Sequence, residues 1–170
     1  MKRHIHPSRA TWRSQARTQR TQRGFTLIEL MVVVSILAII LTAAAPSFRA
    51  FLEGQQVKAL AYDLTTDLLL ARSEALKRNV NVAIARSGAD WSGGWTTATA
   101  ATNERISTRN ASAHTVAISG APAAITFDVN GRVSSPAAEV RITIGSGSAA
   151  SRCVELGLSG RARSSLGECT

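Results

Sequence analysis

The stretch RTQRGFTLIELMVVVSILAIILTAAAPSF, residues Arg20–Phe48, places a single glutamate, Glu29, near the start of a long apolar run. Apart from Glu29, the polar residues between Phe25 and Ala45 are one serine and two threonines. At about 1.5 Å rise per residue, a helix of this length spans the ~30 Å hydrocarbon layer of a membrane. The stretch therefore predicts a helix that crosses a bilayer once, and its one carboxylate requires an explanation.

Basic residues are concentrated in front of this predicted helix. Residues 1–24 contain seven of the 20 Lys and Arg residues and none of the 11 acidic residues. The formal net charge is +9 for the chain but only +2 from Phe25 onward, so the body of the protein carries no strong signal for a nucleic-acid partner. A basic leader before an apolar segment is typical of a targeting sequence. With that leader in the cytoplasm, the residues after Pro46 would lie in the periplasm.

Two alternatives for the apolar run remain open. A secretory signal would be cut after the alanines 43–45, although Pro46 would then follow the cut and Glu29 would lie in the apolar region. A plain single-pass anchor would leave Glu29 unexplained. Cleavage between Gly24 and Phe25 explains Glu29 better, because the new amine of Phe25 would lie one helical turn before the Glu29 carboxylate. A charge in a membrane helix costs about 2.5–3.5 kcal/mol, so an adjacent subunit's amine could act as its partner and set the register of assembly.

Beyond Pro46 the pattern becomes that of an amphipathic helix. Apolar residues recur every three or four positions from Val57 to Ala75, with charged residues between them. We expect one helix to continue to about Lys77, with Pro46 allowing a kink where the membrane part ends. The simplest role for the apolar stripe is packing against the core of a soluble domain.

From Asn79 onward the sequence consists of short alternating runs separated by turn signals. These runs predict an antiparallel sheet with hairpins at Asn130–Gly131 and Ser159–Gly160, and therefore an α+β fold. The segment Thr96–Ala113 is not assigned to any element. The expected organisation is a cleaved leader at 1–24, a transmembrane and assembly helix at 25–46, an amphipathic helix at 47–78 and a β-sheet head at 79–170.

The residues RGFTLIELMVVVSILAII resemble the class III leader and N-terminal helix of type IV pilins and type II secretion pseudopilins. The resemblance implies that a prepilin peptidase in the inner membrane cleaves after Gly24 and methylates the amine of Phe25. It also implies that Glu29 pairs with a neighbouring subunit's N-terminus, and that Pro46 closes the assembly helix. The expected partners are other pilin or pseudopilin subunits, the peptidase and the inner membrane, with the head in the periplasm.

Four further motifs narrow the resemblance. ARSEALKRNVNV, DWSGGW, ITFDVNGRV and a closing pair of cysteines are similar to the FimT/GspH branch of minor pilins and minor pseudopilins. This branch implies a structural subunit that primes or caps a pilus or a secretion pseudopilus. It does not distinguish between the two machines.

The two cysteines, Cys153 and Cys169, both fall in the predicted periplasmic part, where disulfides form readily. A bridge between them would contribute roughly 3 kcal/mol in the chain-entropy model, and two free buried thiols are the alternative. Outside the leader the sequence has one histidine, His114, and therefore no Cys/His cluster with ligand spacing. No nucleophile elbow or phosphate-binding loop is present either. We expect a protein that is not an enzyme and needs no metal or cofactor.

Two groups of residues are candidates for ligand contact. Trp91 and Trp95 either form a stacking platform or, more commonly for such aromatics, pin a loop to the core. The segment SGRARS, Ser159–Ser164, resembles a tail motif of DNA-binding FimT-type minor pilins. In a strand, Arg161 and Arg163 would project from one face, with Arg152 joining them across the hairpin. This predicts weak contact with double-stranded DNA in natural transformation, and two solvated arginines on an edge strand are the alternative.

Overall fold

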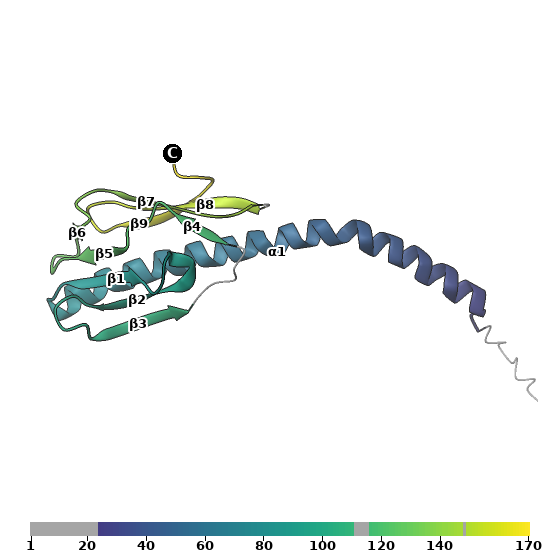
Figure 1. Cartoon of the computed structure of the whole chain (residues 1–170), viewed down its shortest axis with the longest axis horizontal. Coiled ribbons are helices and arrows are strands. Elements are labelled where there is room, and N and C mark those ends of the chain that lie inside the picture. The colour runs from purple at the N-terminus through teal and green to yellow at the C-terminus, as the bar shows by residue number, and fades with distance from the viewer. Residues whose placement is uncertain (1–23, 111–115, 148) are drawn as a thin grey trace, which may run out of the picture. The chain divides into compact units, whose positions relative to one another are not determined.

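The computed structural model describes residues 24–110, 116–147 and 149–170. Residues 1–23 of the expected leader, and the start of the expected strand at His114, lie outside the described residues. The chain divides into two compact units, Met1–Ile40 and Leu41–Thr170. Figure 1 shows the element order: one long helix, α1 (Leu27–Arg78), followed by strands β1 to β9.

In the first unit, residues 27–40 form the beginning of α1, and all described residues from 24 to 40 are exposed. Among the described residues, α1 is the one helix that contains a stretch long and apolar enough to cross a membrane. The expected continuation to about Lys77 agrees with the end of α1 at Arg78. Pro46 lies inside the helix.

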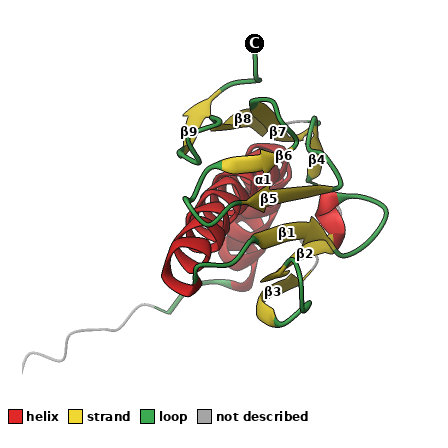
Figure 2. Cartoon of the chain, turned by 90° about the vertical axis from the view of Figure 1, so that its left-hand side faces the viewer, coloured by secondary structure: helices red, strands yellow, loops and turns green. Residues whose placement is uncertain are grey.

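In the second unit, α1 packs one stripe of side chains against the strands. The buried positions recur every three or four residues, as the amphipathic pattern predicted. They are Val57, Leu60, Ala61, Leu64, Asp67, Leu68, Ala71 and Ala75. Figure 2 shows this part of α1 with strands around it, and large apolar side chains from both sheets complete the core.

The strands form two antiparallel sheets rather than the single sheet that was expected. The first has the order β3-β2-β1-β5-β6, and the second has the order β4-β7-β8-β9. The strand bounds are β1 (Val82–Arg86), β2 (Gly94–Thr99), β3 (Arg105–Asn110), β4 (Ala117–Ser119), β5 (Ala124–Phe127), β6 (Val133–Ser135), β7 (Val140–Ser146), β8 (Ala149–Leu156) and β9 (Ala162–Leu166). The α+β fold class is confirmed. Buried side chains of both sheets belong to one core cluster with the buried stripe of α1.

The unassigned segment Thr96–Ala113 is largely strand. Thr96–Thr99 completes β2, and Arg105–Asn110 forms the edge strand β3, while residues 111–113 lie outside the described residues. The β2 side chains alternate, with Thr97 and Thr99 buried. Threonine is β-branched and fits a half-buried strand, although a run of Thr and Ala gives little apolar contrast from which a strand could be predicted.

Both expected hairpins are present. The β5–β6 turn is ordered by Asp128, whose Oδ1 accepts the backbone N–H groups of Asn130 and Arg132, each at 2.9 Å. Gly131 has φ +70° in this turn, and Gly160 has φ +75° in the β8–β9 turn. These are left-handed conformations, for which glycine is the natural choice.

Candidate functional site

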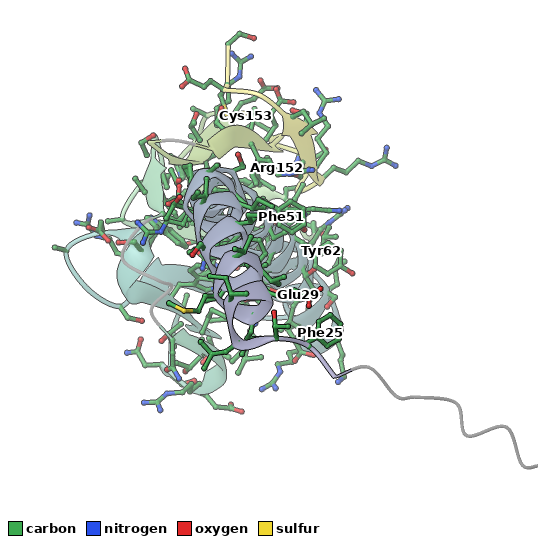
Figure 3. The ribbon with its side chains drawn as sticks, turned by 90° about the vertical axis from the view of Figure 1, so that its right-hand side faces the viewer. Phe25, Glu29, Phe51, Tyr62, Arg152 and Cys153 are labelled. Atoms are coloured by element: carbon green, nitrogen blue, oxygen red, sulfur yellow. A yellow bond between two sulfur atoms is a disulfide. The ribbon has the colours of Figure 1, made fainter. Side chains whose placement is uncertain are left out.

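The predicted processing site is at the beginning of the described chain. Phe25 is exposed, and the residue after it starts the helix: Thr26 Oγ1 accepts the backbone N–H of Glu29 at 3.2 Å. Thr26 is therefore the helix N-cap, and Glu29 lies in the first turn. A carboxylate there interacts favourably with the positive end of the helix dipole. Gly24 and Phe25 lie just before the helix and belong to no helix or strand, and Figure 3 labels Phe25.

The side chains of the apolar part of α1 are exposed. Every side chain from residue 24 to residue 49 is exposed, including the run of Val, Ile and Leu before Pro46. So much contiguous apolar surface is rare on a protein that stays in water as a monomer. A lipid bilayer, other helices, or both would cover such a surface.

The C-terminal hairpin is closed by the expected disulfide. Cys153 and Cys169 are bonded, with a Cα–Cα distance of 5.0 Å. Cys153 lies on β8, and Cys169 follows β9, where its backbone N–H donates to Thr143 Oγ1 on β7 at 3.3 Å. The bridge therefore ties the end of the chain to the middle of the second sheet.

Arg161 and Arg163 line one shallow hollow on the outer face of this sheet. The strand register places Arg141, Glu155 and Arg163 side by side on β7, β8 and β9. Arg163 Nε donates to Glu155 Oε2 at 2.6 Å, and Arg141 donates to the backbone carbonyl oxygen of Thr170. Carboxylates thus lie among the arginines and reduce the positive potential of the face.

Arg152 is not brought together with the other two arginines. It lies two and four positions before the buried residues Val154 and Leu156 on β8, so it shares their face, which is the helix side of the sheet. There it lines a different hollow, with Tyr62 of α1. The expectation of a three-arginine cluster across the hairpin is wrong, because positions 152 and 163 have opposite parity in the β8–β9 register.

The two tryptophans are core residues, as the commoner of the two interpretations held. Trp91 and Trp95 are 2% and 1% exposed, with ring centroids 6.0 Å apart, so neither offers a free stacking face. Trp91 Nε1 donates to the carbonyl oxygen of Pro122 at 2.7 Å. The short helix η1 (Trp91–Gly93) is capped by Asp90, which accepts the N–H groups of Ser92 and Gly93. The Ser92 hydroxyl donates to the same carboxylate, and these hydrogen bonds lower the pKa of Asp90.

Sequence reasoning missed a buried ionic cluster between α1 and the first sheet. Asp67 is 4% exposed, and its Oδ2 accepts Trp95 Nε1 at 2.8 Å and Arg109 Nε at 3.2 Å. Arg109 also lies 3.5 Å from Asp63. The hydrogen bond to Asp67 raises the pKa of Arg109, so the guanidinium stays charged. The spacing of Asp63 and Asp67 on one helical turn was visible, but their partners lie far away in the sequence.

A second ionic contact ties the end of α1 to the β2–β3 loop. Arg78 donates to Glu74 at 2.6 Å and to Glu104 at 2.8 Å. The hydrogen bond from Arg78 lowers the pKa of Glu74, and the two carboxylates raise the pKa of Arg78. These groups are structural. Across the ranges that the structure describes, no three His, Cys, Asp or Glu side chains gather as metal ligands would.

Comparison with known proteins agrees with this geometry. Residues 60–160 match the family described as type II transport protein GspH, and residues 19–45 match the prokaryotic N-terminal methylation motif. Two crystal forms of the type IV minor pilin FimU from Pseudomonas aeruginosa (strain PAO1) have a similar fold. The first is 22% identical, with a TM-score of 0.57, and the match covers 66% of this chain and 90% of that chain. The second is 23% identical, with a TM-score of 0.53 and coverage of 64% and 91%. No match was found among curated proteins.

Proposed function

The chain belongs to the family of the type II transport protein GspH, and we propose that it acts by assembly, as a minor subunit of a type IV pilus or type II secretion pseudopilus. The observation that carries the proposal is the exposed apolar run of α1, which lies within the segment that matches the methylation motif, residues 19–45. In this proposal the inner membrane holds residues 25–45 before assembly, and the head lies in the periplasm. The same helix packs among other subunits after assembly.

Processing is the first test of this proposal. A prepilin peptidase would cut between Gly24 and Phe25 and methylate the new amine. Mass spectrometry of the membrane-extracted protein should find N-methylated Phe25 as the first residue. A mature chain that begins at Pro46 would instead indicate an ordinary secretory signal and would contradict the proposal.

Glu29 is the proposed registry residue. Its carboxylate would pair with the amine of a neighbouring subunit, because an unpaired charge in hydrocarbon costs about 2.5–3.5 kcal/mol. Glu29→Ala should leave membrane insertion intact and reduce incorporation into filaments, as measured by immunoblotting of sheared filaments and of membranes. Thr26→Ala is a useful control, because it removes the helix cap at the same end and keeps the carboxylate. If Glu29→Ala enters filaments at the normal level, the carboxylate does not set the register.

A gene deletion can distinguish a pilus subunit from a secretion pseudopilus subunit. Deletion of the gene should impair either surface pili or the release of secreted proteins, and complementation with the intact chain should restore the same output. Complementation with Glu29→Ala should fail in that same assay, since both machines would require assembly through α1. If deletion impairs neither output, the proposed role in these filaments is wrong.

A second candidate function is weak binding of double-stranded DNA during uptake. It is favoured by one observation, that Arg161 and Arg163 line the same hollow. Glu155 acts against it by holding Arg163 in an ion pair. Because arginines would contact phosphates, binding would be independent of sequence and sensitive to salt. Each lost arginine would reduce the slope of log affinity against log salt concentration by roughly 0.9 on duplex DNA.

Titration of a labelled duplex at low salt tests this candidate. The head from about Phe48 should bind, and the Arg161→Ala/Arg163→Ala double variant should bind more weakly. Glu155→Gln should bind more tightly than the unmodified head, since it releases Arg163 and removes a negative charge. Equal affinity of all three proteins, or no binding by any of them, would leave the structural role alone.

A further inference from the structure

A second hollow, of about 500 Å³, lies between the outward side of α1 and the β8–β9 hairpin, within the unit Leu41–Thr170. Its lining residues are Gln55, Lys58, Ala59, Tyr62 and Thr65 from α1, Arg152 from β8 and Ser164 from β9. Figure 3 labels Tyr62 and Arg152, which belong to the two sides of this hollow. We call it the α1–β8 hollow. None of these residues belongs to the assembly helix, residues 25–46, or lines the hollow that contains Arg161 and Arg163.

The α1–β8 hollow contains two cations and no carboxylate. Lys58 and Arg152 line it, and within the described residues neither of them forms a salt bridge. Arg152 is half-buried, so water solvates its guanidinium less completely than that of an exposed arginine. By contrast, Arg109 and Arg163 both have carboxylate partners. The hollow is therefore electrostatically complementary to a negatively charged group.

Exposed apolar side chains lie on the same two elements as these cations, α1 and the β8–β9 hairpin. Tyr62 is 71% exposed, and Phe51 and Leu69 are also exposed on α1. Their positions are separated by 11 and 7 residues, which places all three on one side of the helix. Leu166, 75% exposed, lies opposite Arg152 in the β8–β9 register. Aromatic side chains and arginine are enriched at protein interfaces.

We propose that the α1–β8 hollow docks an acidic side chain of a neighbouring filament subunit, whose apolar surface covers Tyr62 and Leu166. This inference rests on the proposed function, since assembly is what supplies such a neighbour. Charge complementarity selects a carboxylate. The exposed apolar side chains favour a protein partner over a free anion or a nucleic-acid backbone. A sugar-phosphate backbone would leave Tyr62 and Leu166 exposed to water.

The experiment uses the full-length chain, expressed in its own host in place of the chromosomal copy. The test variant is Lys58→Glu/Arg152→Glu, and a milder form is Lys58→Gln/Arg152→Gln. The matched control is Arg105→Glu/Arg132→Glu, which reverses two exposed cations outside the hollow. The filament-associated fraction should fall about tenfold for the first variant, because like charges would then face each other, and less for the second. The control should assemble like the unmodified chain.

Photocrosslinking identifies the occupant. A photoreactive benzoylphenylalanine at position 62 should give an adduct with another filament subunit, and the adduct should map to a peptide that contains Asp or Glu. The same residue placed at position 102, on the β2–β3 loop, is the control. Reversing the mapped acidic residue to Lys should restore assembly of Lys58→Glu/Arg152→Glu.

The outcomes separate this inference from the function on which it rests. If the unmodified chain enters filaments and both hollow variants do so equally well, the inference is overturned and the proposed function stands. If the unmodified chain never enters filaments, both fail. An adduct confined to a peptide without an acidic residue, or a loss of duplex binding instead of assembly in the variants, would also overturn the inference.

Discussion

Gly160→Ala should be one of the most damaging single changes in the head, although it adds only one methyl group. Gly160 has φ +75°, and a Cβ built there would lie 2.1 Å from the carbonyl oxygen of Gly131, in the other hairpin turn. It would also lie 3.1 Å from Cδ of Arg72 on α1. The two turns are joined by a backbone hydrogen bond from Val133 to Leu158 at 3.1 Å. Gly160 therefore sits where the turns of the two sheets and the helix meet.

The magnitude follows from three separate costs. A non-glycine residue in the left-handed region costs about 1–2 kcal/mol. The clash with the Gly131 carbonyl cannot be relieved by a side-chain rotation, because both groups are backbone, so the turns must separate. Overpacking of this kind costs about 1–3 kcal/mol, and loss of the Val133–Leu158 hydrogen bond costs about 1 kcal/mol more. We expect about 3–6 kcal/mol in total, a large part of the 5–15 kcal/mol that is typical of a domain.

Gly167→Ala is the matched control. Gly167 also has a positive φ, +98°, but a Cβ there would have nothing within 4 Å. Gly167→Ala should therefore destabilise the head only through the unfavourable backbone conformation, by about 1–2 kcal/mol. Both variants of the head can be unfolded in urea with the disulfide intact, and their free energies of unfolding compared. Equal destabilisation of the two would refute the argument that the meeting of the turns makes Gly160 necessary.

The remaining predictions concern the core and its ties. Asp67→Ala should lower the free energy of unfolding by about 2–4 kcal/mol, because it leaves the buried indole N–H of Trp95 without an acceptor and leaves Arg109 with Asp63 alone. Asp63→Ala should cost under about 1 kcal/mol in the same urea titration. Asp90→Asn should lower the thermal midpoint at neutral pH. The pKa of Asp90 is lowered in the folded state, so its carboxylate stabilises the fold at pH values above the ordinary Asp pKa of about 3.9. This stabilisation is lost as the pH falls through the folded-state pKa, so the thermal midpoints of the two proteins should converge in acid. Cys153→Ser/Cys169→Ser should cost roughly 3 kcal/mol, and a reductant should destabilise only the unmodified chain.

Local patterns were sufficient to predict the helix and the hairpins. A stripe of period 3.6 from Val57 to Ala75 can bury only one face, and an Asn-Gly pair between alternating runs strongly favours a tight turn. The division into two sheets could not be predicted in this way. It depends on which strands pair, for example β1 with β5 across the intervening β2, β3 and β4, and no local pattern encodes that choice.

The buried ionic cluster shows the same limit for side chains. Asp67 falls within the helical periodicity of the core, although most acidic residues in proteins are exposed. It is buried because Trp95 and Arg109, on two strands of the first sheet, satisfy its carboxylate. Sequence spacing identifies a carboxylate on a helix, but only the tertiary structure supplies its partners.

The segment Ser159–Ser164 illustrates how a motif can have two explanations at once. Gly160 is required by the junction of the turns, and Arg163 is held by Glu155, so the fold accounts for both without any ligand. Arg161 differs, because it is exposed and has no ion pair within the described residues. A binding defect in a Gly160 variant would therefore report misfolding, and one in an Arg163 variant would combine lost charge with an unpaired Glu155. Arg161→Ala alone should leave the free energy of unfolding within about 0.5 kcal/mol of the original, so any loss of duplex binding in that variant can be assigned to the contact itself.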